Sequence, residues 1–314
     1  MDPQTERQQP LRNLLSSLRE RRFLLVRPGG NWGDDLIYLG AEYLASKLGL
    51  TWRTLECDHF MSEPAGQAGD VIYIHGGGGF TRSASGNSTR CVRKACQTPG
   101  AVVICGPCTV PDEHVLRSLA PEIRDARADR VVFFSRERRT AQIAFDELPS
   151  SVEQFLNEDT AFYLNRDVLL SRVGRIRQRS NLIVVREDPE SVKGSRSAGA
   201  FQSVIDPARF AQTFDHWIRI HAASKTILTN RTHSAICGAI LGSPTTMFDG
   251  AYHKNRSIWE FSLEPRGVRW LSDSDSVPMR PAVDPFLAWI PIAFVRRSWR
   301  LDRIAKGLRG IPLS

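Results

Sequence analysis

The chain has 314 residues, 41% of them hydrophobic and 24% charged, which is an ordinary globular composition with enough apolar side chains for a sizeable core. Six cysteines are too few for a disulfide scaffold, and no stretch approaches the ~18 apolar residues of a membrane-spanning helix. The net charge of +8 indicates an anionic partner, such as a phosphate-bearing substrate, an anionic lipid or a nucleic acid.

Residues 1–22 are polar and contain arginines, so no secretory signal is visible. We therefore expect a reduced, cytoplasmic protein. Because single cores stop growing near ~250–300 residues, the length favours two domains over one.

Short apolar runs alternate with amphipathic segments, which predicts an α/β fold with buried parallel strands. The predicted strands are residues 23–27, 71–75, 102–105, 131–135, 182–186, 226–229 and 245–248. The predicted helices are residues 35–48, 136–146, 207–224 and 234–241.

The strands fall into two sets, separated by a polar and basic segment near residues 165–180 that we interpret as a linker. This predicts an N-terminal domain at residues 1–170 and a C-terminal domain at residues 171–282. The simplest arrangement is two doubly wound, Rossmann-like halves facing a cleft, with ligands at the carboxyl ends of the strands.

The tail at residues 283–314 differs in composition from the rest of the chain. An apolar, aromatic segment at 285–295 precedes a basic one that carries a single acid, Asp302. The basic side chains are Arg296, Arg297, Arg300, Arg303, Lys306 and Arg309. This pattern predicts an amphipathic helix, which either packs on the first domain or lies on an anionic membrane.

Two glycine-rich loops follow predicted strands. Gly30, Asn31 and Gly33 lie in the first loop, directly before Asp34 and a predicted helix. Glycines at such positions let backbone N–H groups approach an anion, while Asp34 is suited to cap the helix. The second loop holds Gly76, Gly77 and Gly78, which predicts close approach of the backbone to a ligand or to another loop.

The pair Cys105 and Cys108 has the C-x-x-C spacing of redox motifs. No tryptophan precedes the pair, so we favour a structural role for two buried thiols. The spacing of Cys91 and Cys96 does not suit a zinc ribbon, and no metal cluster is expected.

Cationic residues gather after the later strands. Arg231, Thr232 and His233 follow one strand and open a helix, and Lys254 comes after the next strand. Arg186 ends a further strand. Arginine, histidine, lysine and a helix N-terminus together predict a site for a small anion with phosphate and carboxylate groups.

The same residues carry a family resemblance. The segment from Arg231-Thr232-His233 through Gly242-Ser243-Pro244 to Lys254-Asn255 resembles the signature region of polysaccharide pyruvyl transferases. The opening Gly30–Asp34 is similar to that family's first glycine motif, and Gly76–Phe80 to its second. Ser135-Arg136-Glu137 and Asp159-Thr160-Ala161 lie where the family has comparable short motifs.

The resemblance implies two Rossmann-like domains of the glycosyltransferase-B type. It implies phosphoenolpyruvate as donor, a sugar acceptor that could be lipid-linked, and no cofactor. Arg231, Thr232 and His233 match the donor-binding run, Lys254 matches a downstream lysine, and Arg186 matches an arginine opening the second domain.

This implies the transfer of an enolpyruvyl group to a sugar as a ketal, with release of phosphate. We expect His233 to be the acid, because the pKa of histidine lies near neutrality. Arg231, Arg186 and Lys254 would hold phosphate and carboxylate. Asp34 is either the base on the acceptor side or a helix cap.

Two other functions fit the same pattern. A glycosyltransferase that uses a nucleotide sugar could have this architecture, since fold does not fix function. A non-catalytic, membrane-associated protein of polysaccharide assembly would use the basic tail as an anchor on the inner face. A nucleic-acid partner is disfavoured, because no recognisable nucleic-acid module is present.

Overall fold

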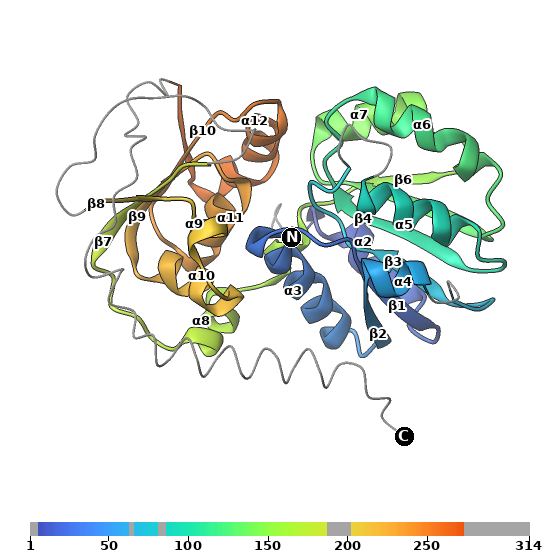
Figure 1. The fold of residues 1–314 in the computed structure, drawn as a ribbon, viewed down its shortest axis with the longest axis horizontal. Helices are drawn as coiled ribbons and strands as arrows, with labels where there is room; N and C mark the ends of the chain where they lie inside the picture. The colour runs from blue at the N-terminus through green and yellow to red at the C-terminus, as the bar shows by residue number, and fades with distance from the viewer. Residues whose placement is uncertain (1–5, 63–65, 81–85, 187–201, 273–314) are drawn as a thin grey trace. The chain divides into compact units, whose positions relative to one another are not determined.

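The structure is a computed structural model that describes residues 6–62, 66–80, 86–186 and 202–272. The chain divides into two compact units, one ending at Leu164 and the other beginning at Asn165. Figure 1 shows that each unit combines helices with a sheet. The tail helix expected at 283–314 lies outside the described residues.

The first unit is built on a parallel sheet. Its strands are β1 (Arg22–Arg27), β2 (Thr51–Glu56), β3 (Val71–Ile74), β4 (Val102–Cys108), β5 (Arg130–Ser135) and β6 (Glu153–Leu156). They lie in the order β2-β1-β3-β4-β5-β6, and every neighbouring pair is parallel. The four central strands are almost entirely buried, as continuous apolar runs in a covered parallel sheet should be.

Helices cover both faces of this sheet. They are α2 (Gln9–Ser17), α3 (Trp32–Lys47), α4 (Cys57–Ser62), α5 (Asn87–Cys96), α6 (Glu113–Arg124) and α7 (Arg138–Glu147), with the 3-10 turn η1 (Thr160–Tyr163). Successive residues of a strand point to opposite faces. Phe23 and Leu25 of β1 therefore pack with α2 and α3, whereas Leu24 and Val26 pack in the cluster formed with α4 to α7.

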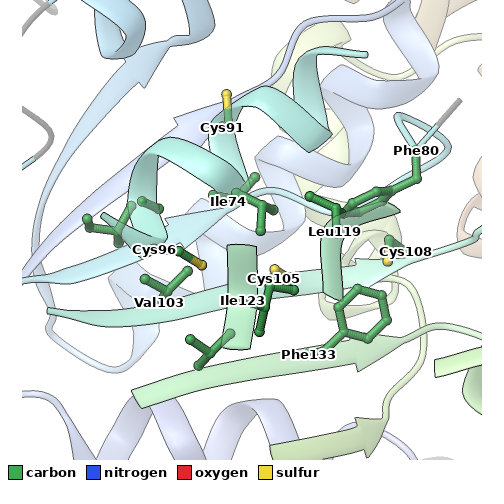
Figure 2. Packing of buried hydrophobic residues seen from close by; sticks show 14 of the residues in the cluster. Ile74, Phe80, Cys91, Cys96, Val103, Cys105, Cys108, Leu119, Ile123 and Phe133 are labelled. Carbon is green, nitrogen blue, oxygen red and sulfur yellow. The ribbon is translucent and has the colours of Figure 1, made fainter. Parts of the chain in front are cut away.

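Figure 2 shows the core beneath α5 and α6. Val103 and Phe133 from the sheet meet Cys96 of α5 together with Leu119 and Ile123 of α6. Each fully buried Leu, Ile, Val or Phe side chain contributes about 1.5–3 kcal/mol relative to an exposed one. This cluster therefore fixes the frame from which the loops at the strand ends project.

A buried ion pair joins two of the short motifs quoted above. The guanidinium of Arg136 donates to the Asp159 carboxylate (Nη1–Oδ2 2.6 Å), and each side chain is 1% exposed. Glu137 caps α7 through the backbone N–H groups of Arg139 and Thr140. Both motifs thus hold the first unit together after β5 and β6.

The second unit has a smaller parallel sheet. Its strands are β7 (Ser180–Val184), β8 (Gln202–Ile205), β9 (Ser224–Thr229), β10 (Thr245–Phe248) and β11 (Arg269–Leu271), in the order β11-β10-β9-β7-β8. Its helical elements are α8 (Arg166–Val173), α9 (Pro207–Phe210), α10 (Phe214–Ala222), α11 (Thr232–Leu241), α12 (Lys254–Ile258), the π-helical η2 (Trp259–Leu263) and the 3-10 turn η3 (Glu264–Arg266).

The two sheets have the same strand order. In each, the first strand lies between the second and the third, and later strands are added beside the third. The order reverses between β1 and β3 in the first unit and between β7 and β9 in the second. In doubly wound sheets, ligands bind outside the carboxyl ends of the strands at this reversal. The topology therefore points to the loops after β1, β3, β7 and β9.

The structure corrects two sequence interpretations. The segment at 165–180 contains helix α8, which Asn165 caps by accepting a hydrogen bond from the Val168 N–H (3.0 Å), so it is not simply a linker. The two units divide between Leu164 and Asn165, near the expected boundary at residue 170. The single helix predicted at 207–224 is two helices, because Thr213 caps a new one at the His216 N–H (3.0 Å).

No helix among the described residues is long and apolar enough to cross a membrane.

Candidate functional site

The loop after β1 ends in a capping box. The Asn31 side chain accepts a hydrogen bond from the Gly33 N–H (2.9 Å), and Asp34 Oδ2 accepts one from the Asn31 N–H (2.9 Å). These bonds satisfy N–H groups at the start of α3. Asp34 was considered as a base or as a helix cap, and the structure shows it capping α3.

The glycines of both loops pack against protein. A Cβ on Gly30 would lie 2.1 Å from the Asp34 carboxylate, and one on Gly76 would lie 1.9 Å from the carbonyl oxygen of Pro107. The Gly77 N–H donates to that same Pro107 oxygen (3.1 Å). Gly78 lies in the adjacent bend and is half-buried. Close approach to another loop thus explains Gly76 and Gly77 without a ligand.

Side chains fill the reversal point of the first sheet. The His75 ring is buried, with its centroid 4.7 Å from Tyr38 and 5.2 Å from Tyr73. Burial, assisted by the positive charge of Arg27, holds the His75 pKa well below its usual value. Arg27 itself is bound to Glu42. His75 packs against the two tyrosine rings, and neither of its ring nitrogens has a hydrogen-bond partner among the described residues.

The second unit brings most of the predicted anion-binding residues to one edge. Arg186 follows β7, Arg231 to His233 follow β9, and Lys254 follows β10, which are three neighbouring strands. Because parallel strands end at the same edge of a sheet, these residues share the carboxyl edge at the reversal point.

Two asparagines tie the three strand ends together. Asn230 Oδ1 accepts a hydrogen bond from the Arg186 N–H (3.1 Å). Asn255 Nδ2 donates to the carbonyl oxygens of Asn230 (2.7 Å) and Phe248 (3.1 Å), and its Oδ1 accepts from Thr232 Oγ1 (2.9 Å). Thr232 and both asparagines are buried, so this network fixes the edge. Thr232 contributes to the framework through its hydroxyl.

Arg231 is held by a carboxylate. Its Nε donates to Asp206 Oδ1 (2.6 Å), and its Nη2 donates to Asp206 Oδ2. The Asp206 side chain is 1% exposed and that of Arg231 is 10% exposed. This two-point pairing sets the position of the arginine at the N-cap of α11. The pairing also uses the Nε and Nη2 edge of the guanidinium, through which an arginine would otherwise bind a phosphate.

The N-terminus of α11 combines several features of an anion site. Among the described residues, Arg231 makes no side-chain capping bond there. Within that same part of the chain, Asn230 Nδ2 and Ser234 Oγ have no hydrogen-bond partner, although these residues are 0% and 1% exposed. An unpaired buried polar group costs roughly 1–3 kcal/mol. The backbone N–H groups of the first turn of α11 favour an anion at this helix N-terminus.

His233 and Lys254 lie on two neighbouring helices of the second unit, α11 and α12. His233 is the second residue of α11 and is half-buried. Lys254 opens α12, and its Nζ lies 4.9 Å from the centre of the Tyr252 ring, a cation–π contact. His233 thus lies in the first turn of α11, and Lys254 lies at the start of α12.

The cysteines play a structural part. Cys105 and Cys108 are buried in β4 with free thiols, as the sequence predicted, and burial raises the pKa of both. Across the described residues, no group of three or more His, Cys, Asp or Glu side chains is placed to hold a metal ion.

Sequence reasoning missed four residues of this site: Asp206, Asn230, Ser234 and Asn255. Asp206 follows β8, a strand that was not predicted. Ser234 and Asn255 lie inside the signature region, and Asn230 lies directly before it. Asn230 follows a strand, and Ser234 lies in the first turn of a helix. A polar residue directly after a strand, or in the first turn of the helix that follows, could have indicated a ligand site.

No protein-family model matches the chain, and no curated protein matches it. A crystal structure of an uncharacterized protein from Klebsiella pneumoniae is similar at a TM-score of 0.64 with 20% identity, covering 87% of this chain and 100% of that one. The two chains thus share a fold. The Escherichia coli heptosyltransferase WaaC with ADP gives a TM-score of 0.40 with 11% identity, covering 88% of this chain and 99% of that one. At that score nothing further follows for this chain.

Proposed function

We propose that this protein is a pyruvyl transferase that moves the enolpyruvyl group of phosphoenolpyruvate onto a sugar of a polysaccharide precursor as a ketal. The observation that carries the proposal is the N-terminus of α11, where buried Asn230 Nδ2 and Ser234 Oγ lack partners among the described residues. Phosphoenolpyruvate carries a phosphate and a carboxylate within one small molecule. Both groups suit a helix N-terminus next to a histidine and a lysine.

In this proposal the residues take different parts. Because Asp206 holds Arg231, that arginine positions the first turn of α11, and the donor groups that meet the anion are Asn230, Ser234 and the first-turn N–H groups. Lys254 and Arg186 supply positive charge at the same sheet edge. This division between holding the helix and holding the ligand resembles that of other preorganised anion sites.

The reaction needs one proton donor and one leaving-group site. His233 gives a proton to the methylene carbon of phosphoenolpyruvate, which leaves positive charge on the carbon that bears the phosphate. One sugar hydroxyl adds to that carbon and passes its proton back to His233, and the phosphate departs with the electron pair of its bond to carbon. A second hydroxyl of the sugar then adds to the same carbon and closes the ketal, and its proton goes to the released phosphate. The helix N-terminus stabilises the phosphate as its negative charge increases.

Incubation of the full chain with carbon-13-labelled phosphoenolpyruvate and lipid-linked oligosaccharides tests this function. We expect inorganic phosphate and an acid-labile pyruvate ketal to form in equal amounts, detected by a phosphate assay and by carbon-13 NMR. A parallel reaction should contain nucleotide sugars instead of phosphoenolpyruvate. Consumption of a nucleotide sugar, with phosphoenolpyruvate left intact, would favour glycosyl transfer and contradict the proposal.

A further inference from the structure

A cavity of about 540 Å³ lies in the first unit, at the amino ends of β1 and β2. Residues 19–22, between α2 and β1, form one wall, and Leu48, Gly49 and Thr51, between α3 and β2, form the other. The hollow is open to solvent, and most of the residues that line it are exposed. This cavity belongs to the first unit, whereas α11 belongs to the second.

Guanidinium groups dominate the lining. Arg19, Arg21 and Arg22 face a single acid, Glu20, whose carboxylate binds Arg19 (Nε–Oε1 2.9 Å). Asp70 fixes Arg22 through two bonds (Nε–Oδ1 2.9 Å and Nη2–Oδ2 2.6 Å), and hydrogen bonding to Asp70 raises the Arg22 pKa. Each guanidinium carries five N–H donors, so both arginines keep donors beyond these bonds.

Of the three arginines in the lining, Arg21 is the one most available to a ligand. It is exposed, and no acidic side chain of the described residues lies within ion-pair distance of it. Thr51 adds a hydroxyl, and the space where Gly49 would carry a Cβ is open. Several guanidinium donors and a hydroxyl around one hollow match the oxygens of a phosphate.

We propose that this cavity, called here the arginine pocket (residues 19–22, 48, 49 and 51), binds a phosphate-bearing anion. The phosphate could belong to a soluble diphosphate or to a lipid headgroup, and both offer the same oxygens. The exposed Trp52 on the neighbouring edge strand is a residue type suited to a membrane interface. The inference is independent of the function proposed for α11.

Residue-resolved arginine modification tests the pocket on the full chain. The protein is treated with phenylglyoxal in the presence of inorganic pyrophosphate, of phosphatidylcholine vesicles, or of such vesicles with added phosphatidic acid. Peptide mass spectrometry then gives the rate at Arg21 and at Arg124, which is also exposed in the first unit. We expect pyrophosphate or the anionic vesicles to slow modification of Arg21 and to leave the rate at Arg124 unchanged. Protection by pyrophosphate assigns a soluble ligand, and protection by anionic vesicles assigns a lipid.

Substitution gives the matching affinity measurement. Arg21→Ala should weaken binding of the protecting anion by about tenfold, the effect of losing one charge-assisted contact. Arg124→Ala removes the same charge from the same unit and should leave the affinity unchanged. Equal effects of the two variants, equal protection of the two arginines, or no protection by any of the anions would overturn the proposal.

Discussion

Replacing His233 by glutamine should lower the turnover of phosphoenolpyruvate by about 10²–10⁴-fold, the usual contribution of a positioned general acid. Glutamine keeps a hydrogen-bonding side chain of similar reach but has no proton to give at neutral pH. Because the change leaves the donors at Asn230 and Ser234 in place, the dissociation constant for phosphoenolpyruvate should change little. Phosphate release and calorimetric binding, measured on the same preparation, separate the two effects.

The exposed His114 on α6 supplies a matched control. His114→Gln makes the same chemical change on a surface helix of the first unit and should retain full turnover. Wild-type turnover in His233→Gln would remove this histidine from the mechanism. A loss of donor binding in His233→Gln would instead assign His233 to holding the anion.

Removing the Asp206 carboxylate should destabilise the second unit by about 3–5 kcal/mol, because it leaves the Arg231 charge buried without its partner. The pair is well shielded from solvent, with side-chain exposures of 10% for Arg231 and 1% for Asp206. Urea unfolding of Asp206→Ala against the wild type measures this change. Asp206 also accepts a hydrogen bond from the Ala208 N–H (3.2 Å) as the cap of α9. Asp206→Asn keeps an acceptor for that cap, so it should still show most of the destabilisation expected for Asp206→Ala.

The comparison variant is Asp215→Ala, also in the second unit. Asp215 pairs with Arg172 (2.8 Å), but those side chains are 26% and 31% exposed. Partly exposed pairs contribute about 0–1 kcal/mol. If Asp206→Ala and Asp215→Ala lower the free energy of unfolding by the same amount, the buried pair does not hold the start of α11.

The sequence predicted those elements whose signal is local. β1, β3, β4 and β5 are runs of buried apolar residues and were found, with small differences at their ends. The edge strands β2 and β6 were missed because their residues are mostly polar or exposed, so no apolar run marks them. Local pattern is informative only where both faces of a strand are covered.

The roles of site residues depend on partners distant in sequence. Arg231 was predicted to bind the anion because of its position before a helix, yet its guanidinium pairs with Asp206. Asp206 follows β8, a strand that the apolar pattern did not predict. Gly76 was predicted to lie close to a ligand or another loop, and only the structure identifies Pro107 as the neighbour. That these cationic residues share one sheet edge was predictable, because three cationic segments each follow a strand of one parallel set.

Calorimetric titration of phosphoenolpyruvate into the wild type and into Ser234→Ala tests the central claim, that the N-terminus of α11 binds the donor. Since Ser234 Oγ has no partner among the described residues, its removal should leave the free energy of unfolding unchanged or slightly raised. The loss of a hydrogen bond to a charged ligand should weaken donor binding by about 10–100-fold. Ser171→Ala, an exposed position on α8, should bind as the wild type does. Equal affinity of Ser234→Ala and the wild type, or no binding by the wild type, would contradict the account.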